Sequence, residues 1–382
     1  VSAPRVAAAR TLGATPWRAF WRVECPAIAP WLASALCLVF LYCFAGFGLA
    51  LVLGGQRYAT AEVEIYTLVA HELELGRASV LAVWMLALTG AVALGYAAIE
   101  RRLAAPGRVV PVLRQRPRGL GPWLAVGGAL ALLAVVCAAP LLAIVWQAGR
   151  ALLAGQGAAV LGETDTLAAL WNTLRFSITA LVCATLLGLL HALGVRTLDA
   201  AAQARHAGPA PGALALVWRA AAFLPFVVSS VTVAFGLLLL YPEASASLAL
   251  LIAAYVLLAY PFVAKSLAAA LDGLPASLAQ AAATLGARPW RVFWRVTLPL
   301  VAPALRRGMA FAAATALGEF AVSLFLARPE WTTLSTLIYQ HLGRPGQANL
   351  DAAFVLAGLL MVLALGAFTL IEGRPATSDR HA

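Results

Sequence analysis

Eight apolar stretches, each about as long as a membrane-spanning helix, constrain the fold of this chain more than any other feature. A hydrocarbon core of about 30 Å needs roughly 20 apolar residues in helical form. A helix is favoured in lipid because it satisfies its own backbone hydrogen bonds. The sequence therefore predicts an all-α polytopic membrane protein. The eight stretches cover approximately residues 31–54, 78–99, 122–146, 169–194, 214–240, 248–264, 308–327 and 352–371.

The composition agrees with a lipid environment and excludes several classes of protein. Only 11% of the residues are charged and the mean hydropathy is +0.88, whereas soluble domains carry about 25% charged residues. The net charge of +11 does not indicate nucleic-acid binding, because the basic residues are dispersed between apolar runs. The five cysteines show neither a C-x-x-C spacing nor a disulfide framework. The sequence has no metal-ligand cluster, paired carboxylates or nucleophile–base set, so we expect no cofactor, and a membrane enzyme is disfavoured.

The distribution of basic residues predicts the orientation in the membrane. Cytoplasmic segments of membrane proteins are enriched in Lys and Arg. If the N-terminal segment is cytoplasmic and the chain crosses eight times, 21 of the 27 basic residues lie in cytoplasmic segments. The outer segments are acidic instead. We therefore expect a multi-pass protein of the cell inner (plasma) membrane with both ends in the cytoplasm.

The chain contains a long internal repeat. Residues 8–30 align without gaps on residues 281–303 at a constant offset of 273, and sixteen of the 23 positions are identical. The register continues further along, since Phe47 matches Phe320 and Tyr66 matches Tyr339. Duplication of one membrane unit within the chain explains this pattern, and it predicts two homologous halves.

The repeat also predicts the domain organisation. Residues 122–372 form a second half with six spans, and its copy of the repeat lies between the fourth and fifth of them. Residues 1–100 contain only two spans after their copy, so we expect the first half to be truncated, with four spans upstream of Val1. Residues 101–121 read as a cytoplasmic linker, and residues 373–382 as a cytoplasmic tail.

The repeated segment has a defined local structure. Ser277–Leu285 is composed of good helix formers and ends at Gly286, a typical C-terminal cap. Pro289 opens a second short helix, on which Trp290, Phe293 and Trp294 share one face and Arg291 lies on the neighbouring face. Aromatic side chains beside arginine are typical of protein–protein hot spots but also of helices anchored at lipid headgroups. Both interpretations remain open on this face alone.

The duplicated A-A-x-x-x-G element resembles the cytoplasmic loop of permeases from binding-protein-dependent ABC importers. The consensus in that family is E-A-A, three residues, G, nine residues and I-x-L-P. The matches end at Pro26 in the first copy and at Leu298 and Pro299 in the second, while the acidic first position is replaced by Ala7 and Gln280. The resemblance implies the type I ABC importer transmembrane fold.

In that family the loop forms a coupling helix that seats in a cleft of an ATPase. Two copies imply two ATP-binding cassette ATPase subunits for each permease chain, and ATP hydrolysis by those subunits rather than by this chain. A substrate-binding protein, periplasmic or extracellular, is the other implied partner. The resemblance implies a coupling role for two sets of residues. They are Ala8, Ala9, Gly13, Pro16, Trp17 and Arg18 in the first copy, and Ala281, Ala282, Gly286, Pro289, Trp290 and Arg291 in the second.

Three further segments resemble the two-half permeases of thiamine importers. They are FAGFGLALVLGGQRYATAEVEIYTL at 44–68, LGEFAVSLF at 317–325 and TLSTLIYQHLG at 333–343. This similarity implies thiamine or a thiamine phosphate as the substrate, with a ferric-iron importer as the alternative. An ion-coupled secondary transporter is the alternative from another class. It is disfavoured because such a transporter needs ionisable residues within its spans, and because both copies of the repeat face the cytoplasm.

Glu319 is the one carboxylate deep within a predicted span. Intramembrane charges are costly and usually functional, and the repeat position of Glu319 in the first half is Gly46. Glu319 is therefore a candidate for the translocation path, where its charge would favour a cation. The alternative is a structural role, for example as a partner of Arg175.

Overall fold

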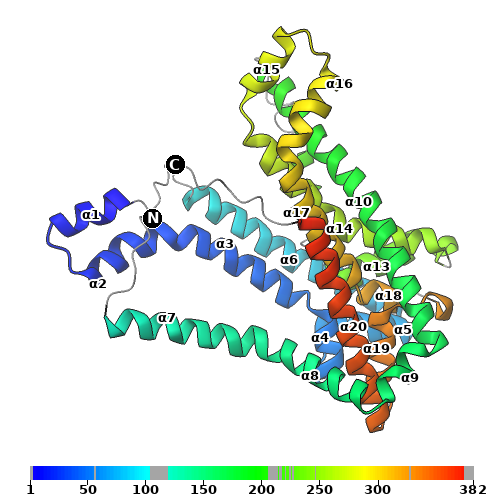
Figure 1. The fold of residues 1–382 in the computed structure, drawn as a ribbon. Coiled ribbons are helices and arrows are strands. Elements are labelled where there is room, and N and C mark those ends of the chain that lie inside the picture. The colour runs from blue at the N-terminus through cyan, green and yellow to red at the C-terminus, as the bar shows by residue number, and fades with distance from the viewer. Residues whose placement is uncertain are drawn as a thin grey trace. The chain divides into compact units, whose positions relative to one another are not determined.

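In the computed structural model every regular element of the described residues is helical (Figure 1). The chain divides into two compact units, one comprising Val1–Gly46 and Leu75–Ala143 and the other Phe47–Glu74 and Ile144–Ala382. The structure describes residues 3–55, 57–103, 119–204, 214, 217–219, 221–222, 225, 228–245, 247–326 and 328–373.

The first unit contains the N-terminal copy of the repeat and the helices that follow it. Its helix α3 packs against α6. The elements are α1 (Ala3–Thr11), α2 (Pro16–Ala19), the π-helical turn η1 (Phe20–Glu24), α3 (Cys25–Phe44), α6 (Leu75–Leu103), α7 (Leu120–Leu133), the π-helical turn η3 (Ala134–Ala138) and the start of α8 (Ala139–Leu153).

The second unit contains the C-terminal copy of the repeat and a bundle built on α10, α14, α17 and α20. Its elements before the second copy are α4 (Phe47–Leu49), the π-helical turn η2 (Ala50–Gly54), α5 (Ala61–Ala70), α9 (Gln156–Gly162), α10 (Thr164–Ala204), α13 (Ser230–Leu240), the 3₁₀ turn η4 (Pro242–Ala244) and α14 (Leu248–Asp272). From the second copy onward they are α15 (Ala276–Thr284), α16 (Pro289–Val292), the π-helical turn η5 (Phe293–Thr297), α17 (Leu298–Leu317), α18 (Ala321–Leu326), the 3₁₀ turn η6 (Pro329–Trp331), α19 (Leu334–Leu342) and α20 (Gln347–Glu372).

Small residues bring the central helices of this bundle close together. A Cβ atom added at Gly188 of α10 would lie 2.8 Å from the Cβ of Val263 on α14, and one added at Gly308 of α17 would lie 2.9 Å from the Cα of Val263. Ala259 and Ala312 are fully buried in the same cluster. Close backbone approach through Gly and Ala is the usual way in which membrane helices pack, because lipid gives no hydrophobic drive for helix association.

Five of the eight predicted spans are confirmed as helices long and apolar enough to cross a bilayer. The span predicted at 248–264 continues through Pro261 to Asp272, eight residues further than the apolar pattern indicated. The five helical segments are Leu75–Gly95, Leu120–Leu153, Thr164–Asp199, Leu248–Asp272 and Gln347–Glu372.

The prediction of single spans over 31–54 and 308–327 is wrong. Helix α3 ends at Phe44, and a short non-helical segment separates it from α4. Helix α17 runs from Leu298 to Leu317, and a similar non-helical segment separates it from α18. The two breaks occupy the same position of the repeat. Apolar composition could not reveal them, because the broken segments are as apolar as continuous helices.

The prediction of a continuous helix over 214–240 is also wrong. Helix α13 begins at Ser230, and Ser229 caps it by accepting a hydrogen bond from the N–H of Thr232 at 3.1 Å. Eleven residues of helix extend about 16 Å, which is shorter than the hydrocarbon core. Most of residues 205–227 lie outside the described residues, as do 104–118 of the expected linker and 374–382 of the expected tail.

Candidate functional site

The A-A-x-x-x-G element of the repeat is a helix-terminating hydrogen-bond motif in both copies. In the second copy the N–H of Ala287 donates to the carbonyl of Ala282 at 3.1 Å, and that of Gly286 donates to Ala283 at 2.9 Å. This is the Schellman pattern, which requires a left-handed residue after the helix, and Gly286 has a φ of 75°. The predicted cap is confirmed.

The first copy has the same geometry. The N–H of Ala14 donates to the carbonyl of Ala9 at 3.1 Å, and that of Gly13 donates to Arg10 at 3.0 Å. Gly13 has a φ of 80°. The backbone of this element is therefore built twice, which explains why alanine and glycine recur at the same spacing.

A second short helix follows the turn in each copy, as the sequence predicts. Pro16 is the first residue of α2 and Pro289 the first of α16. Thr15 caps α2 by accepting a hydrogen bond from the N–H of Arg18 at 3.4 Å. A π-helical turn then begins at Phe20 in one copy and at Phe293 in the other. Such wide turns often occur at functional sites.

Three aromatic rings pack against each other on this short helix and its π-helical turn. In the second copy the ring centroids of Trp290 and Phe293 lie 6.2 Å apart, and those of Trp290 and Trp294 lie 5.4 Å apart. Trp290 is 71% exposed and its counterpart Trp17 is 72% exposed. Arg291 is also exposed beside these rings. We call these residues, with their counterparts in the first copy, the aromatic–arginine patches.

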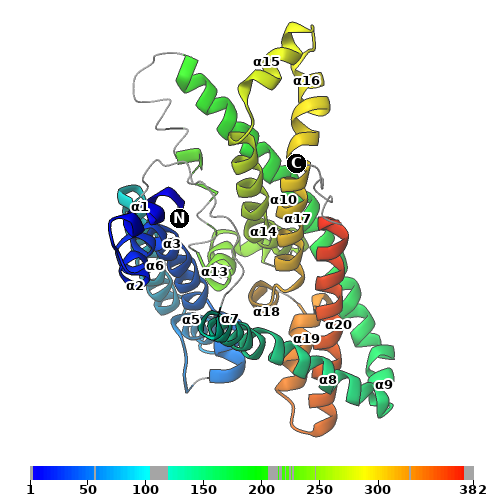
Figure 2. The ribbon, with the colours of Figure 1, turned by 60° about the vertical axis from the view of Figure 1, so that its left-hand side comes forward.

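The patch of the second unit lies at one end of its helix bundle. α15 and α16 lie past the ends of α14 and α17, while α18 and α19 lie toward the other end of these helices (Figure 1 and Figure 2). Within this unit α16 is therefore well separated from the break between α17 and α18.

Four aromatic residues form a second cluster around that break. The rings of Phe47 and Phe320 stack with centroids 5.9 Å apart, while Tyr66 lies 5.5 Å from Phe47 and Tyr339 lies 5.4 Å from Phe320. Because Phe47 matches Phe320 and Tyr66 matches Tyr339 in the repeat, the cluster has two equivalent halves. We call it the aromatic quartet.

A cavity of about 260 Å³ adjoins the aromatic quartet. It lies between α4 and η2 on one side and α19 on the other, and its lining is apolar apart from the polar groups of two side chains. The lining residues are Gly48, Leu49, Val52, Leu53, Phe320, Ser335, Ile338, Tyr339 and Leu342.

Glu319 lies in the break between α17 and α18 and is buried. Its Oε1 accepts a hydrogen bond from the N–H of Val322 at 3.1 Å, and its own carbonyl accepts one from the hydroxyl of Ser335 at 2.9 Å. Arg175, the hypothesised partner, instead places its guanidinium over the ring of Phe176, 4.8 Å from the centroid. The carboxylate of Glu319 is therefore held by the first turn of α18.

A second carboxyl group, that of Glu62, is also buried, and no pattern in the sequence predicts this. Glu62 lies in the first turn of α5 and its side chain is fully buried. Burial raises its pKa to about 8, the hydroxyl of Ser229 partly offsets this, and the nearby Glu319 carboxylate adds to it. The repeat position of Glu62 is Ser335. A comparison of repeat positions shows that Glu62 is a charge present in one half only, but it does not show that the side chain is buried.

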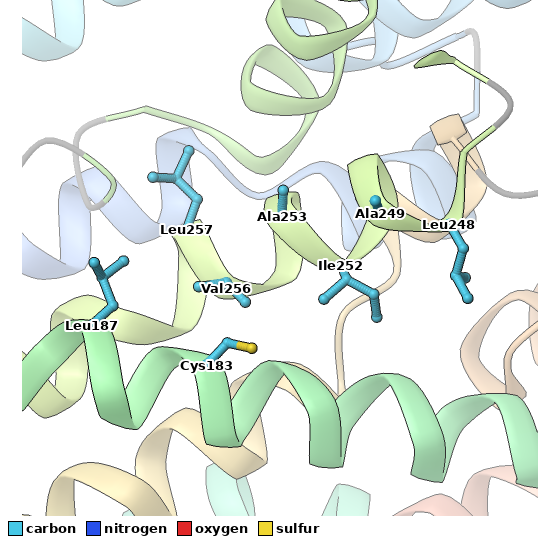
Figure 3. Close-up of a pocket in the computed structure, with 8 residues that line it drawn as sticks. All are labelled: Cys183, Leu187, Leu248, Ala249, Ile252, Ala253, Val256 and Leu257. Carbon is cyan, nitrogen blue, oxygen red and sulfur yellow. The ribbon is translucent and has the colours of Figure 1, made fainter.

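An apolar groove of about 670 Å³ runs between α10 and α14. Figure 3 shows Cys183 and Leu187 on α10 opposite Ile252 and Val256 on α14. The groove has no charged side chain, so it suits hydrocarbon and not a charged solute. Elsewhere in the described part of the chain, no three His, Cys, Asp or Glu side chains gather as a metal site would require.

Comparison with known proteins gives one family. The profile described as "Binding-protein-dependent transport system inner membrane component" matches residues 2–105 and 210–371. The fold is similar to a chain in the crystal structure of a bacterial alginate ABC transporter in complex with an alginate pentasaccharide-bound periplasmic protein. The TM-score is 0.50 at 18% identity, over 65% of this chain and 91% of that chain. At this identity the similarity shows the fold alone.

Several curated proteins are similar to parts or most of the chain. The thiamine transport system permease protein ThiP of Escherichia coli (strain K12) is 27% identical over 96% of this chain and 67% of its own. The putative 2-aminoethylphosphonate transport system permease protein PhnV of Salmonella typhimurium is 28% identical over 53% of this chain and 72% of its own. The molybdenum transport system permease protein ModB of Haemophilus influenzae is 32% identical over 28% of this chain and 47% of its own.

Proposed function

Because the chain belongs to the family of binding-protein-dependent transport system inner membrane components, we propose that it is the importer permease for thiamine or a thiamine phosphate. As a member of that family it is the permease of an ABC importer, a membrane-embedded subunit and not an enzyme. ATP is hydrolysed by a separate ATPase subunit. The cargo, the docking sites and the orientation are the parts that we propose.

The extent of one similarity is the observation that carries the thiamine proposal. ThiP of Escherichia coli aligns over 96% of this chain, and so over both halves, whereas PhnV and ModB align over 53% and 28% of it. The chemistry around Glu319 is compatible with this cargo. An organic cation is attracted to aromatic ring faces, and Phe320 of the aromatic quartet directly follows Glu319 in the chain.

We propose Glu319 as the acidic residue of the translocation path. Phe320, its neighbour in the chain, stacks on Phe47 where the two halves of the aromatic quartet meet. A cation that passes between these rings would experience the negative charge of Glu319. The hydrogen bond from Val322 fixes the position of that charge.

The two aromatic–arginine patches are the proposed docking sites for two ATPase subunits. Exposed clusters of Trp and Arg are typical of interface hot spots, and the rings of each patch pack against one another. The permease would then lie in the cell inner membrane with both patches facing the cytoplasm. A substrate-binding protein would deliver the cargo from the opposite side of the membrane. The docking residues are Ala8, Ala9, Gly13, Pro16, Trp17, Arg18, Ala281, Ala282, Gly286, Pro289, Trp290 and Arg291.

Uptake by the reconstituted importer tests which substrate the permease transports. The full-length permease, its ATPase and its binding protein are reconstituted in vesicles, and ATP-dependent accumulation of labelled thiamine is measured. We expect the vesicles to take up labelled thiamine. Excess unlabelled thiamine should abolish this uptake, whereas ferric iron or 2-aminoethylphosphonate should leave it unchanged. Accumulation of ferric iron or 2-aminoethylphosphonate without thiamine would overturn the proposal.

The variant Glu319→Gln separates charge from shape in the same assay. It keeps an acceptor for the N–H of Val322 while removing the negative charge. We expect a lower rate of thiamine uptake with normal assembly of the complex. Unchanged uptake in Glu319→Gln, together with failed assembly in Glu319→Ala, would assign Glu319 a structural role only.

A further inference from the structure

The carboxyl group of Glu62 is buried without the partners that a negative charge needs. Its side chain is 0% exposed. The Ser229 hydroxyl is near enough to lower the pKa of the carboxyl group, but neither carboxyl oxygen makes a well-aligned hydrogen bond within the described part of the chain. Burying an ionised carboxylate without such partners is very costly, and the group usually becomes neutral instead. The environment of Glu62 therefore decides its protonation state.

The N-terminal cap of α13 brings a polar group from another element close to Glu62, since the hydroxyl of Ser229 acts on its pKa. The hydroxyl of Ser229 donates to the hydroxyl of Thr232 at 2.9 Å and accepts from the N–H of Thr232 at 3.1 Å. Its single proton is thus already used within the cap, and a carboxylate at Glu62 would compete for it. The Ser229 oxygen keeps a further lone pair that could accept a hydrogen bond.

The charges that face Glu62 also disfavour its ionised form. Helix α5 packs against α13, and α13 contains no ionisable side chain. Glu319, just before α18, is the ionisable group whose charge acts on Glu62, and it has the same sign. Two neighbouring carboxyl groups in one buried site do not both ionise readily.

The repeat shows which chemistry suits this position. Ser335, the counterpart of Glu62, uses its hydroxyl as a donor to the carbonyl of Glu319 at 2.9 Å. A neutral carboxylic acid also carries an O–H donor, whereas a carboxylate carries none. A protonated Glu62 would therefore be a donor, as its counterpart is.

We propose that Glu62 is a proton-binding site: it is held as the neutral acid while α5 packs on α13, and it loses its proton to water when the two helices separate. In that step the O–H bond of the acid breaks, the proton goes to water and the carboxylate keeps the electron pair. The inference does not rest on the identity of the cargo. It goes beyond the proposed role of Glu319.

The proposal links proton release to movement of α5. With Glu62 ionised, the α5–α13 contact would bring two negative charges together in a buried site, so the ionised form favours separated helices. Once separated, Glu62 and Glu319 would both be negatively charged and hydrated. Higher pH should therefore loosen α5, and a neutral side chain at position 62 should abolish this response.

Infrared difference spectroscopy of the purified full-length permease tests the protonation state directly. A neutral carboxylic acid has a C=O stretch that a carboxylate lacks. We expect wild type at neutral pH to show this band, Glu62→Gln to lose it, and Glu319→Gln to keep it and titrate at lower pH, because a repelling charge has been removed. A band that disappears in Glu319→Gln and persists in Glu62→Gln would overturn the proposal.

Hydrogen exchange of the α5 peptide tests the coupling to movement. Comparing each variant with wild type at the same pH cancels the intrinsic effect of pH on exchange. We expect wild-type α5 to exchange faster than α5 of Glu62→Gln at alkaline pH and equally at acidic pH. Glu64→Gln, on the same helix but partly exposed, should behave as wild type.

Two outcomes of the exchange experiment would contradict the proposal. One is an equal response to pH in wild type and Glu62→Gln, and the other is a pH response that Glu64→Gln removes. If Glu62→Gln did not assemble, Glu62→Ser supplies the hydroxyl that the repeat uses at this position. We expect Glu62→Ser to lose the infrared band and the pH response, as Glu62→Gln does.

Discussion

The rings of Phe47 and Phe320 stack at a centroid distance of 5.9 Å and an interplanar angle of 23°. The two residues occupy the same position in the two copies of the repeat. Each also contacts the tyrosine that the repeat places nineteen residues further along, Tyr66 or Tyr339. Residues at equivalent positions of the two halves therefore also contact each other.

A double-mutant cycle on Phe47 and Phe320 measures this contact. Leucine at either position keeps an apolar side chain but removes the ring, and Phe47 is the more deeply buried of the two. We expect Phe47→Leu to lower the free energy of unfolding more than Phe320→Leu. We also expect a coupling of about 1 kcal/mol between the two changes, as for other aromatic pairs. Additive effects of the two substitutions would mean that the stacking contributes no stability.

The glycine that ends the first helix of each loop should be sensitive to any side chain. Gly286 and Gly13 have φ values of 75° and 80°, and an L-residue pays roughly 1–2 kcal/mol in the left-handed region. We expect Gly286→Ala to weaken ATPase binding about fivefold or more, because the turn that orients the patch is strained.

A glycine after another helix of the same unit provides the control. Gly273 follows α14 with a φ of −78°, a value that alanine readily adopts. Gly273→Ala should therefore leave ATPase binding unchanged. Equal effects of the alanine substitutions at 286 and 273 would show that the left-handed turn does not matter for docking.

The orientation of the chain can be tested by cysteine labelling from each side of the membrane. Thr15 and Arg288 are exposed residues next to the two short helices, and Glu163 is an exposed residue of an expected outer segment. We expect Thr15→Cys and Arg288→Cys to react only with reagent on the cytoplasmic side, and Glu163→Cys only from outside. Reaction of either loop cysteine from outside would contradict the proposed topology.

Much of the fold follows from the sequence because hydropathy and length determine where a helix can cross a bilayer. The long helices at 75–103 and 347–372 are confirmed for this reason. The helix breaks near Gly46 and Glu319 could not be predicted, because apolar composition does not distinguish a continuous helix from a broken one. Their matching positions became visible only in the structure.

The local structure of the repeated loop was predictable because turn chemistry is local. Gly286 and Pro289 have the roles that backbone sterics give to glycine after a helix and to proline at its start. The burial of Glu62 was not predictable, since it depends on α13, which is far away in the sequence. Asn172 is a similar case: its side chain donates to the carbonyls of Glu330 and Thr332, at 3.0 and 2.8 Å.

We propose that the chain carries two equivalent docking sites for an ATPase. Trp17 and Trp290 are highly exposed, so truncating them should leave the fold intact while removing a hot spot. Trp171 of α10 is 64% exposed but lies outside both patches, and Trp171→Ala is the matched control.

Native mass spectrometry of the full-length permease with excess nucleotide-free ATPase counts the bound subunits. We expect two ATPase subunits on wild type and on Trp171→Ala, one on Trp17→Ala or Trp290→Ala, and none on the double variant. Two subunits retained by the double variant, or a single subunit on wild type, would show that the aromatic–arginine patches are not two ATPase docking sites.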